Sequence, residues 1–171
     1  SMACKGIFGK DRDGPIDPAR LPRKKTAVQL PKRGEADVKT DGVGLLRRHP
    51  KVAVVCSHNS GGAYFGEQFV NFNRVYVKGL KDVRLVDCVC FLKNGGILAI
   101  DWKHPTDWKE PDWDWLVAKE MREGLRGMLS KDEAKELGQK RFLDTVAALP
   151  NGIGIFVTDV SMVLDALERI A

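Results

Sequence analysis

The chain has 171 residues, of which 43% are apolar and 8% aromatic, and this is enough material for one hydrophobic core. No run approaches the roughly 18 uncharged apolar residues of a membrane span, and the first residues lack the apolar stretch of a signal peptide, so we expect a soluble, intracellular, cytoplasmic protein with no membrane contact. The cysteines are too few for a disulfide scaffold, and the spacing of Cys88 and Cys90 differs from that of a zinc knuckle, so we expect buried thiols.

The net charge of +5 is distributed unevenly along the chain. Residues 1–51 hold 13 Lys or Arg and 6 Asp or Glu, a balance of +7, whereas residues 52–171 hold 15 and 17, a balance of −2. Five of the eight prolines also fall in residues 1–51, which predicts an irregular N-terminal arm. A basic arm can bind the phosphates of nucleic acid or can be a solvated tail, and charge alone favours neither. The candidate nucleic-acid-binding residues are Arg23, Lys24, Lys25, Lys32, Arg33, Arg47 and Arg48.

A strand and a helix are predicted at the start of the second part, residues 52–171. Residues 52–56 are apolar and predict a short buried strand, which a turn rich in Asn, Ser and Gly follows. Residues 63–76 predict a helix, because aromatic residues recur there at helical spacing and Ser60 can cap its start. These aromatic residues are Phe65, Phe69, Phe72 and Tyr76. On such a helix Glu67 lies across from the aromatic stripe.

A β-hairpin is predicted next, from residues 83–92 and 97–102, which are rich in β-branched and apolar side chains. Asn-Gly-Gly at residues 94–96 supplies the positive φ angles of a tight connection. A Trp-rich insertion follows at about residues 104–130, and its rings either pack against the protein or stack on unpaired bases. The pattern then predicts helices, a buried strand and a closing amphipathic helix. Their ranges are 114–129, 131–149, 153–158 and 161–170. This order predicts an α/β fold with a central mixed sheet of about four strands flanked by helices.

Charged residues interrupt the apolar runs of the predicted hairpin. Asp101 and Lys103 are two positions apart at the end of one strand, so their side chains lie on the same face. Asp87 interrupts the preceding strand, where a half-buried carboxylate needs a partner. If residues 94–96 form a three-residue loop, Val89 lies opposite Asp101 and Asp87 lies opposite Lys103. All three charges then share a face, whereas a two-residue loop would move Asp87 to the other one.

Two carboxylates a few ångströms apart suit Mg²⁺ or Mn²⁺, which keep water ligands and accept phosphate oxygens. In phosphodiester hydrolysis such a cation activates a bound water, and a lysine stabilises the developing negative charge. A D-x-K pair by itself is usually a solvated ion pair. The shared face of Asp87, Asp101 and Lys103, together with the apolar run before Asp101, favours a catalytic site.

The series Asp87 followed by Asp101-Trp102-Lys103 resembles the signature of the PD-(D/E)xK nucleases, with Val86 where that signature has proline. VRR-type nucleases are the most similar, because their acid-x-Lys strand continues into a basic residue and a proline, as residues 103–105 do here. A helix with a Gln shortly before a bulky apolar pair also fits them, as at Gln139. The archaeal and RecU-type Holliday junction resolvases are a second resemblance.

The resemblance implies a restriction-endonuclease-like core and a set of residue roles. Asp87, Asp101 and the main-chain carbonyl of Trp102 would be metal ligands, and Lys103 would be the catalytic lysine. Gln139 would support the site from its helix, and Glu67 would be a further catalytic or metal-binding acid. The implied function is a Mg²⁺- or Mn²⁺-dependent endonuclease acting on DNA, including structured or branched DNA. The alternative is an inactive module of the same fold that binds nucleic acid or a protein partner, and a homodimer stays open.

Overall fold

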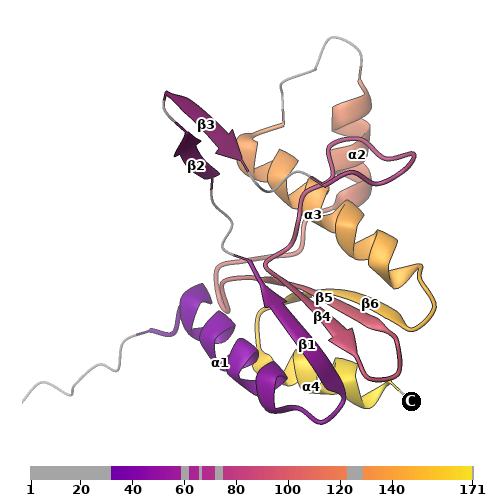
Figure 1. Cartoon of the computed structure of the whole chain (residues 1–171). Coiled ribbons are helices and arrows are strands. Elements are labelled where there is room, and N and C mark those ends of the chain that lie inside the picture. The colour runs from indigo at the N-terminus through magenta and orange to yellow at the C-terminus, as the bar shows by residue number, and fades with distance from the viewer. Residues whose placement is uncertain (1–31, 59–61, 66, 72–74, 123–128, 171) are drawn as a thin grey trace, which may run out of the picture. The chain divides into compact units, whose positions relative to one another are not determined.

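The structure is a computed structural model, shown in Figure 1. It describes residues 32–58, 62–65, 67–71, 75–122 and 129–170. The chain divides into two compact units, Ser1–Lys32 and Arg33–Ala171, and every element named below belongs to the second. None of the helices in the described ranges combines the length and the apolar composition needed to cross a bilayer.

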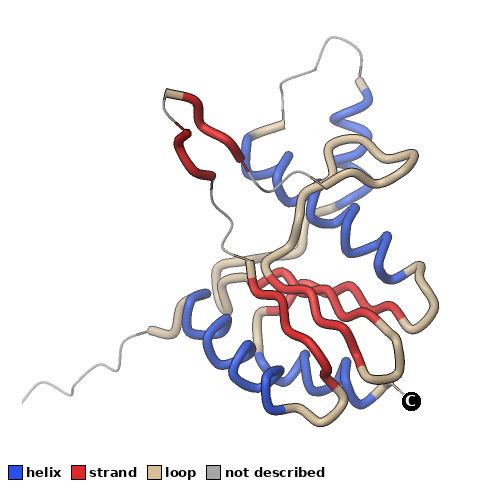
Figure 2. Tube along the Cα trace, viewed as in Figure 1, coloured by secondary structure: helices blue, strands red, loops and turns tan. Residues whose placement is uncertain are grey.

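Four strands form one mixed sheet in the order β1-β4-β5-β6. The strands are β1 (Val52–Ser57), β4 (Cys88–Leu92), β5 (Ile97–Trp102) and β6 (Gly152–Val157). Both pairs that involve β4 are antiparallel, whereas β6 runs parallel to β5. Helices lie on both sides of this sheet (Figure 2). The predicted α/β class, with a mixed sheet of about four strands flanked by helices, is therefore confirmed.

Two helices lie on each side of the sheet (Figure 2). The helices α1 (Glu35–Arg48) and α4 (Val160–Glu168) cover one face of the sheet and contact each other. On the opposite face α3 (Lys131–Ala147) packs against β5 and β6, and α2 (Trp113–Met121) packs against α3. The predicted order of two helices, a strand and a final helix is confirmed. The helix predicted over residues 114–129 ends at Met121, and residues 123–128 lie outside the described part.

The alternation of side chains along the strands divides them between two cores. Leu98, Ile100 and Trp102 of β5 belong to the larger core beneath α1 and α4. The predicted buried thiols, Cys88 and Cys90, lie in the same core with their Sγ atoms 3.8 Å apart. Ala99 of β5 points to the other side and packs in the smaller core beneath α3. By the same alternation, Asp101 points toward α3.

Residues 35–48 form the helix α1, although the proline content of residues 1–51 predicted an irregular arm. The compact unit accordingly begins at Arg33 instead of at residue 52. The Asp37 carboxylate accepts a hydrogen bond of 2.8 Å from the N–H of Gly34 and so caps the helix. All five prolines of residues 1–51 lie outside α1. The high proline content of the whole segment therefore does not apply to the helix itself, which contains no proline. The prediction of an irregular segment is wrong for these residues.

Gly42 and Gly44 of α1 form a matched pair for testing how closely this helix packs on the sheet. A Cβ atom on Gly42 would lie 2.2 Å from Cη2 of Trp102, whereas the nearest atom to a Cβ on Gly44 is 3.8 Å away. Alanine normally stabilises a helix by about 0.5–1 kcal/mol relative to glycine. We expect Gly44→Ala to raise the free energy of unfolding by about that amount and Gly42→Ala to lower it by about 1–3 kcal/mol through overpacking. Urea denaturation measures both, and equal effects would contradict the close approach to Trp102.

A β-hairpin replaces the helix predicted over residues 63–76. Its strands are β2 (Gly62–Phe65) and β3 (Gln68–Asn71), and Tyr64 pairs with Phe69. Phe65 and Phe69 flank a short turn, so their spacing of four fits a hairpin as well as a helix, and aromatic residues favour strands. The helical prediction is wrong for these strands, while Ser60 and Phe72 lie outside the described residues.

The hairpin of β4 and β5 forms as predicted, but its register differs by two residues. Val89 pairs with Ala99 instead of Asp101. The loop consists of residues 93–95 instead of 94–96, since the N–H of Leu92 donates to the Gly96 carbonyl at 2.9 Å. Gly95 has the positive φ, 83°, that the last position of such a loop requires. A shift of two residues leaves every side chain on its predicted face, so Asp87 falls opposite Asp101 when the ladder is continued.

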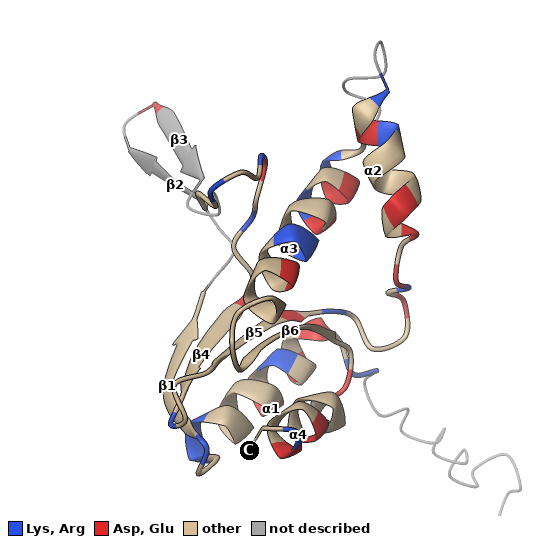
Figure 3. Cartoon of the chain, turned by 90° about the vertical axis from the view of Figure 1, so that its right-hand side faces the viewer, with Lys and Arg blue, Asp and Glu red and all other residues tan. Residues whose placement is uncertain are grey.

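Acidic and basic residues are interspersed over the helices of this unit (Figure 3). Residues 33–171 hold 20 Lys or Arg and 20 Asp or Glu, so their formal charges cancel. Residues 1–32 hold 8 Lys or Arg and 3 Asp or Glu, which accounts for the whole net charge of +5. The basic character of the chain therefore belongs to its first 32 residues.

Candidate active site

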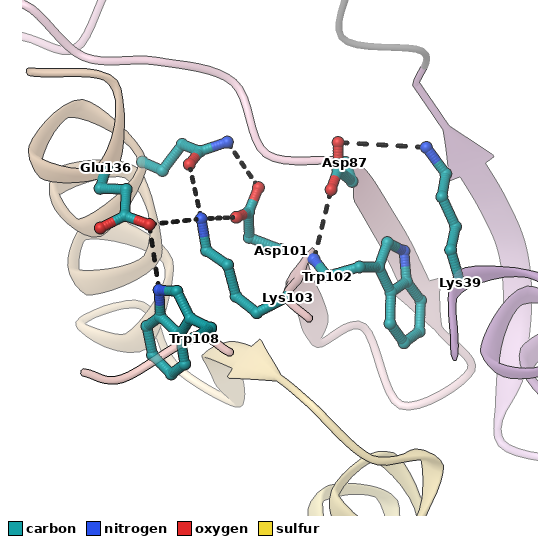
Figure 4. A network of polar contacts seen from close by, with 8 residues as sticks. Lys39, Asp87, Asp101, Trp102, Lys103, Trp108 and Glu136 are labelled. Atoms are coloured by element: carbon teal, nitrogen blue, oxygen red, sulfur yellow. Dashed lines mark hydrogen bonds and ion pairs between the residues drawn. The ribbon is translucent and has the colours of Figure 1, made fainter. Parts of the chain in front are cut away.

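Asp101 and Lys103 form a buried ion pair where β5 ends. The Nζ atom of Lys103 lies 2.9 Å from Oδ2 of Asp101 (Figure 4). Asp101 is 1% exposed and Lys103 is 8% exposed, so neither charge is appreciably hydrated by bulk solvent. The predicted shared face of these two residues is thus observed, and their burial distinguishes them from a solvated surface pair.

Gln139 on α3 closes a triangle of hydrogen bonds with this pair. Its Nε2 atom donates to Oδ1 of Asp101 at 2.6 Å, and its Oε1 atom accepts from Nζ of Lys103 at 3.3 Å. The amide is 1% exposed, and both ends of it have partners in the site. The contact expected of Gln139 is therefore present, while its part in catalysis stays a prediction.

Glu136 is a member of the site that the sequence did not identify. Its Oε1 atom accepts a hydrogen bond from Lys103 Nζ at 3.2 Å and another from Trp108 Nε1 at 3.0 Å (Figure 4). Lys103 Nζ consequently faces three oxygen atoms, one each from Asp101, Glu136 and Gln139, which match its three N–H donors. The available signal was spacing, because residues three apart on a helix share a face and Glu136 precedes Gln139 by three.

Asp87 directly precedes β4, the strand beside that of Asp101, and its carboxylate is held by the main chain. Its Oδ2 atom accepts a hydrogen bond of 3.2 Å from the N–H of Trp102, and its side chain is buried. Lys39 of α1 approaches from the other side, with Nζ 4.0 Å from Asp87 Oδ1 (Figure 4). Lys39 also donates to the carbonyl of His58 at 3.0 Å, which fixes the ammonium beside the strand ends. The sequence did not single out Lys39, because it assigned this segment to an irregular arm.

Burial sets the protonation of the site. It raises the pKa of Asp101 to about 6, from a usual value of 3.8; the charge of Lys103 opposes this rise and the charge of Asp87 adds to it. Burial also lowers the pKa of Lys103, but the negative charges and hydrogen bonds of Asp101 and Glu136 outweigh that effect and leave its pKa raised. At neutral pH the site therefore holds a charged ammonium and an ionised Asp101 that is easily protonated.

Asp87 and Asp101 are the two carboxylates that would hold a hard divalent cation. The negative charge of Asp87 raises the pKa of Asp101, and a cation shared by both carboxylates would relieve that repulsion. No group of three or more His, Cys, Asp or Glu in the described ranges is placed to hold a metal ion. Trp102, whose carbonyl is the predicted main-chain ligand, lies between Asp101 and Lys103 in the chain.

Glu67 is not brought to this site by any described contact. It lies in the turn between β2 and β3, where its side chain is exposed, and not on the predicted helix. The helical position on which its supporting role depended is therefore wrong.

The candidate DNA-binding residues are spread over both units. Arg23, Lys24 and Lys25 lie outside the described residues, and Lys32 belongs to the first unit. Arg33 forms an exposed ion pair with Asp41. Arg47 and Arg48 are exposed in the last turn of α1, roughly 12 Å along the helix from Lys39 at 1.5 Å per residue. None of these described residues contacts the triangle of Asp101, Lys103 and Gln139.

Two of the inserted tryptophans pack beside the site. The ring of Trp113 stacks on Phe156 of β6 at 5.4 Å, and the ring of Trp108 lies tilted at 5.3 Å from the same side chain. Lys103 Nζ is 5.2 Å from the Phe156 ring centroid and 5.9 Å from that of Trp108. Trp115 is exposed instead, beside Lys119. Of the two expectations for these rings, packing describes Trp108 and Trp113, and the rings of Trp108 and Phe156 lie beside the Lys103 ammonium.

The resemblance to PD-(D/E)xK nucleases rests on this site alone. A scan against protein families, a search of curated proteins and a search of solved structures each give no match. The support for a function therefore comes from the contacts of Asp101, Lys103 and Gln139 and from the position of Asp87.

Proposed function

We propose that this chain is a Mg²⁺- or Mn²⁺-dependent nuclease that hydrolyses phosphodiester bonds in DNA, with a site of the PD-(D/E)xK type. The observation that carries the proposal is the buried triangle of Asp101, Lys103 and Gln139, with Asp87 at the start of the adjacent strand β4. Burying a carboxylate and an ammonium usually stabilises a fold no better than apolar residues of the same size. Their burial in a small cluster at the end of a strand, with a perturbed pKa, is typical of a functional site.

Each side chain has a distinct task in this proposal. Asp87 and Asp101 hold the cation, which supplies an activated water and neutralises charge on the scissile phosphate when bound. Lys103 places a positive charge beside the reacting oxygens and stabilises their developing negative charge. Gln139 orients Asp101, and Glu136 keeps Nζ of Lys103 in place through the contacts of 2.6 Å and 3.2 Å described above.

DNA as the substrate follows from the distribution of charge. Because residues 33–171 have no net charge, binding of the polyanion falls to residues 1–32, which include Arg23, Lys24 and Lys25. A basic segment of this kind binds phosphates through counterion release and is independent of base sequence. This combination suits an enzyme that recognises the backbone or the shape of DNA, including branched DNA.

Incubation of the full chain with supercoiled plasmid, single-stranded DNA and a four-way junction tests the proposal. Cleavage of at least one substrate is expected with Mn²⁺ or Mg²⁺, and EDTA should abolish it. Intact DNA in all three reactions with both metals would remove the reason to regard the chain as a nuclease.

A second candidate is a catalytically inactive module of the same fold that binds nucleic acid or a protein. The observation in its favour is that both Asp101 oxygens already have partners, Oδ1 with Gln139 and Oδ2 with Lys103. A network whose members all have partners is sufficient to hold β5 to α3 without any catalytic role. Tight DNA binding without cleavage in either metal would favour this candidate.

Metal affinity should depend on pH through Asp101. The raised pKa of Asp101, about 6, means that protons compete with a cation below this pH, whereas the carboxylate is ionised and available above it. We expect the dissociation constant for Mn²⁺, measured by calorimetry, to rise as pH falls through about 6. The same shift lowers folding stability as pH rises from the usual value of 3.8 toward 6, because the ionised form is disfavoured by burial.

Asp101→Asn is the control for this dependence. The variant should bind Mn²⁺ weakly at every pH and should lack the inflection near the pKa of Asp101. An affinity that is constant for the parent between mildly acidic and neutral pH would show that Asp101 does not hold the cation.

A further inference from the structure

The strand β6 forms an outer edge of the sheet, with β5 as its one neighbour in the sheet order. The N–H of Lys103 donates to the carbonyl of Val157 at 2.8 Å, so the peptide groups of Val157 point toward β5. Peptide groups alternate in direction along a strand, so those of Gly154 and Phe156 point away from the sheet. Within the described part of the chain no backbone hydrogen bond from another element reaches these two residues. The edge therefore presents open donors and acceptors.

This edge lacks the features that usually prevent strands from associating. Residues 152–157 read Gly-Ile-Gly-Ile-Phe-Val, with no charged residue and no proline. The opposite edge differs, because the register of β1 is irregular between Val52 and Val54. Protein sheets commonly protect their edges with charges, prolines or bulges. An unprotected apolar edge is thus a feature that calls for a partner strand.

Two cavities adjoin β6 and provide room for the side chains of such a partner. The larger, about 550 Å³, lies between β6 and α4, and Ile153, Ile155 and Met162 are among the residues that line it. The smaller, about 250 Å³, spans the edge itself, since Met162 from the α4 side and Phe156 from the α3 side both line it. A strand added at this edge would have space for alternate side chains on both faces of the sheet.

We propose that this edge binds a second copy of the same chain, with β6 pairing antiparallel to β6 of the other copy about an axis at Ile155. Gly154 of one copy then faces Phe156 of the other, and these residues exchange both N–H···O=C bonds on either side of the axis. Ile155 faces its own counterpart, which buries two half-exposed apolar side chains.

Charge on α4 favours a second copy over an unrelated peptide. Asp165 and Arg169 are exposed one helical turn apart, and both line the larger cavity. Neither forms an ion pair with any other described residue. A two-fold axis sets the two α4 helices antiparallel, so Asp165 of each copy can meet Arg169 of the other. The surface is therefore complementary to itself.

Light scattering coupled to size exclusion, applied to the full chain, tests the pairing with two matched variants. Met162 and Leu164 are 38% and 39% exposed on the same helix, but Leu164 does not line either cavity. We expect a dimer for the parent and for Leu164→Glu, and a monomer for Met162→Glu, with unchanged circular dichroism in all three. A monomeric parent across the micromolar range, or a dimer that survives Met162→Glu, overturns the proposal.

A charge exchange provides a second, independent test. Asp165→Arg and Arg169→Asp should each weaken the dimer at least about tenfold, and the double variant should restore it. Failure of the double variant to recover overturns the antiparallel arrangement. The assay requires no nuclease activity, so Asp101→Asn should dimerise like the parent whatever the fate of the proposed function.

Discussion

Asp101→Asn is expected to reduce the rate of DNA cleavage by about a hundredfold to a thousandfold while the chain stays folded. Asparagine keeps the size of Asp101, but it has one acceptor oxygen where Gln139 and Lys103 both donate, so one of these two contacts is lost. It removes the negative charge that a divalent cation requires, and the loss of one group that stabilises a transition state costs about 10²–10³ in rate. The measurement is the initial rate on the best DNA substrate at saturating Mn²⁺.

Lys103→Met should lose activity to a similar extent, because methionine fills the site but cannot stabilise negative charge. The matched control is Asp144→Asn, since Asp144 is exposed on α3, where it pairs with Lys140. It makes the same chemical change as Asp101→Asn away from the site, and we expect it to cut at the parental rate. If Asp101→Asn and Lys103→Met also cut like the parent, the assignment of the site is wrong.

The parts of this site that the sequence predicts are those set by local periodicity. Asp101 and Lys103 share a face because side chains alternate along any strand, whatever it pairs with. Asp87 was placed with a register that proved two residues off, and its face was still right because the error was an even number. Gln139 was named through the resemblance to VRR-type nucleases, and the buried partners that its amide needs are Asp101 and Lys103.

The parts of the site that the sequence does not predict depend on tertiary contacts or on competing local preferences. Spacing puts Glu136 on the same helical face as Gln139, but its contact with Lys103 depends on how α3 crosses the end of β5, which spacing does not encode. The spacing of the aromatic residues around Glu67 fits both a helix and a hairpin. The chain forms the hairpin, and Glu67 lies in the turn between β2 and β3. Lys39 lies in a helix without proline, but the prolines on either side of this helix predicted an irregular segment.

The Trp-rich insertion shows why composition alone could not assign its role. Trp108 lies against Phe156 and donates to Glu136, so one residue belongs both to the apolar packing and to the polar network around Lys103. Covering the ammonium with aromatic rings limits its hydration, and this strengthens its interaction with Asp101. The insertion therefore helps to define the electrostatics of the site through packing.

Breaking the buried ion pair should destabilise the fold far more than breaking the exposed one. Asp101→Ala leaves the Lys103 ammonium buried with only Glu136 as a charged partner, and we expect the free energy of unfolding to fall by about 3–5 kcal/mol. Asp144→Ala removes the partner of Lys140 on an exposed surface, where such pairs contribute about 0–1 kcal/mol. Urea denaturation at neutral pH compares the two variants directly.

The double variant Asp101→Leu with Lys103→Met separates a structural role from a catalytic one. Apolar residues of similar volume remove both buried charges at once, and such replacements are often neutral or stabilising. We expect the double variant to recover most of the stability lost in Asp101→Ala but none of the cleavage, since it lacks both the Asp101 carboxylate and the Lys103 ammonium. A free energy of unfolding as low as that of Asp101→Ala would mean that the polar network itself holds α3 to β5. The ion pair would then have a mainly structural role.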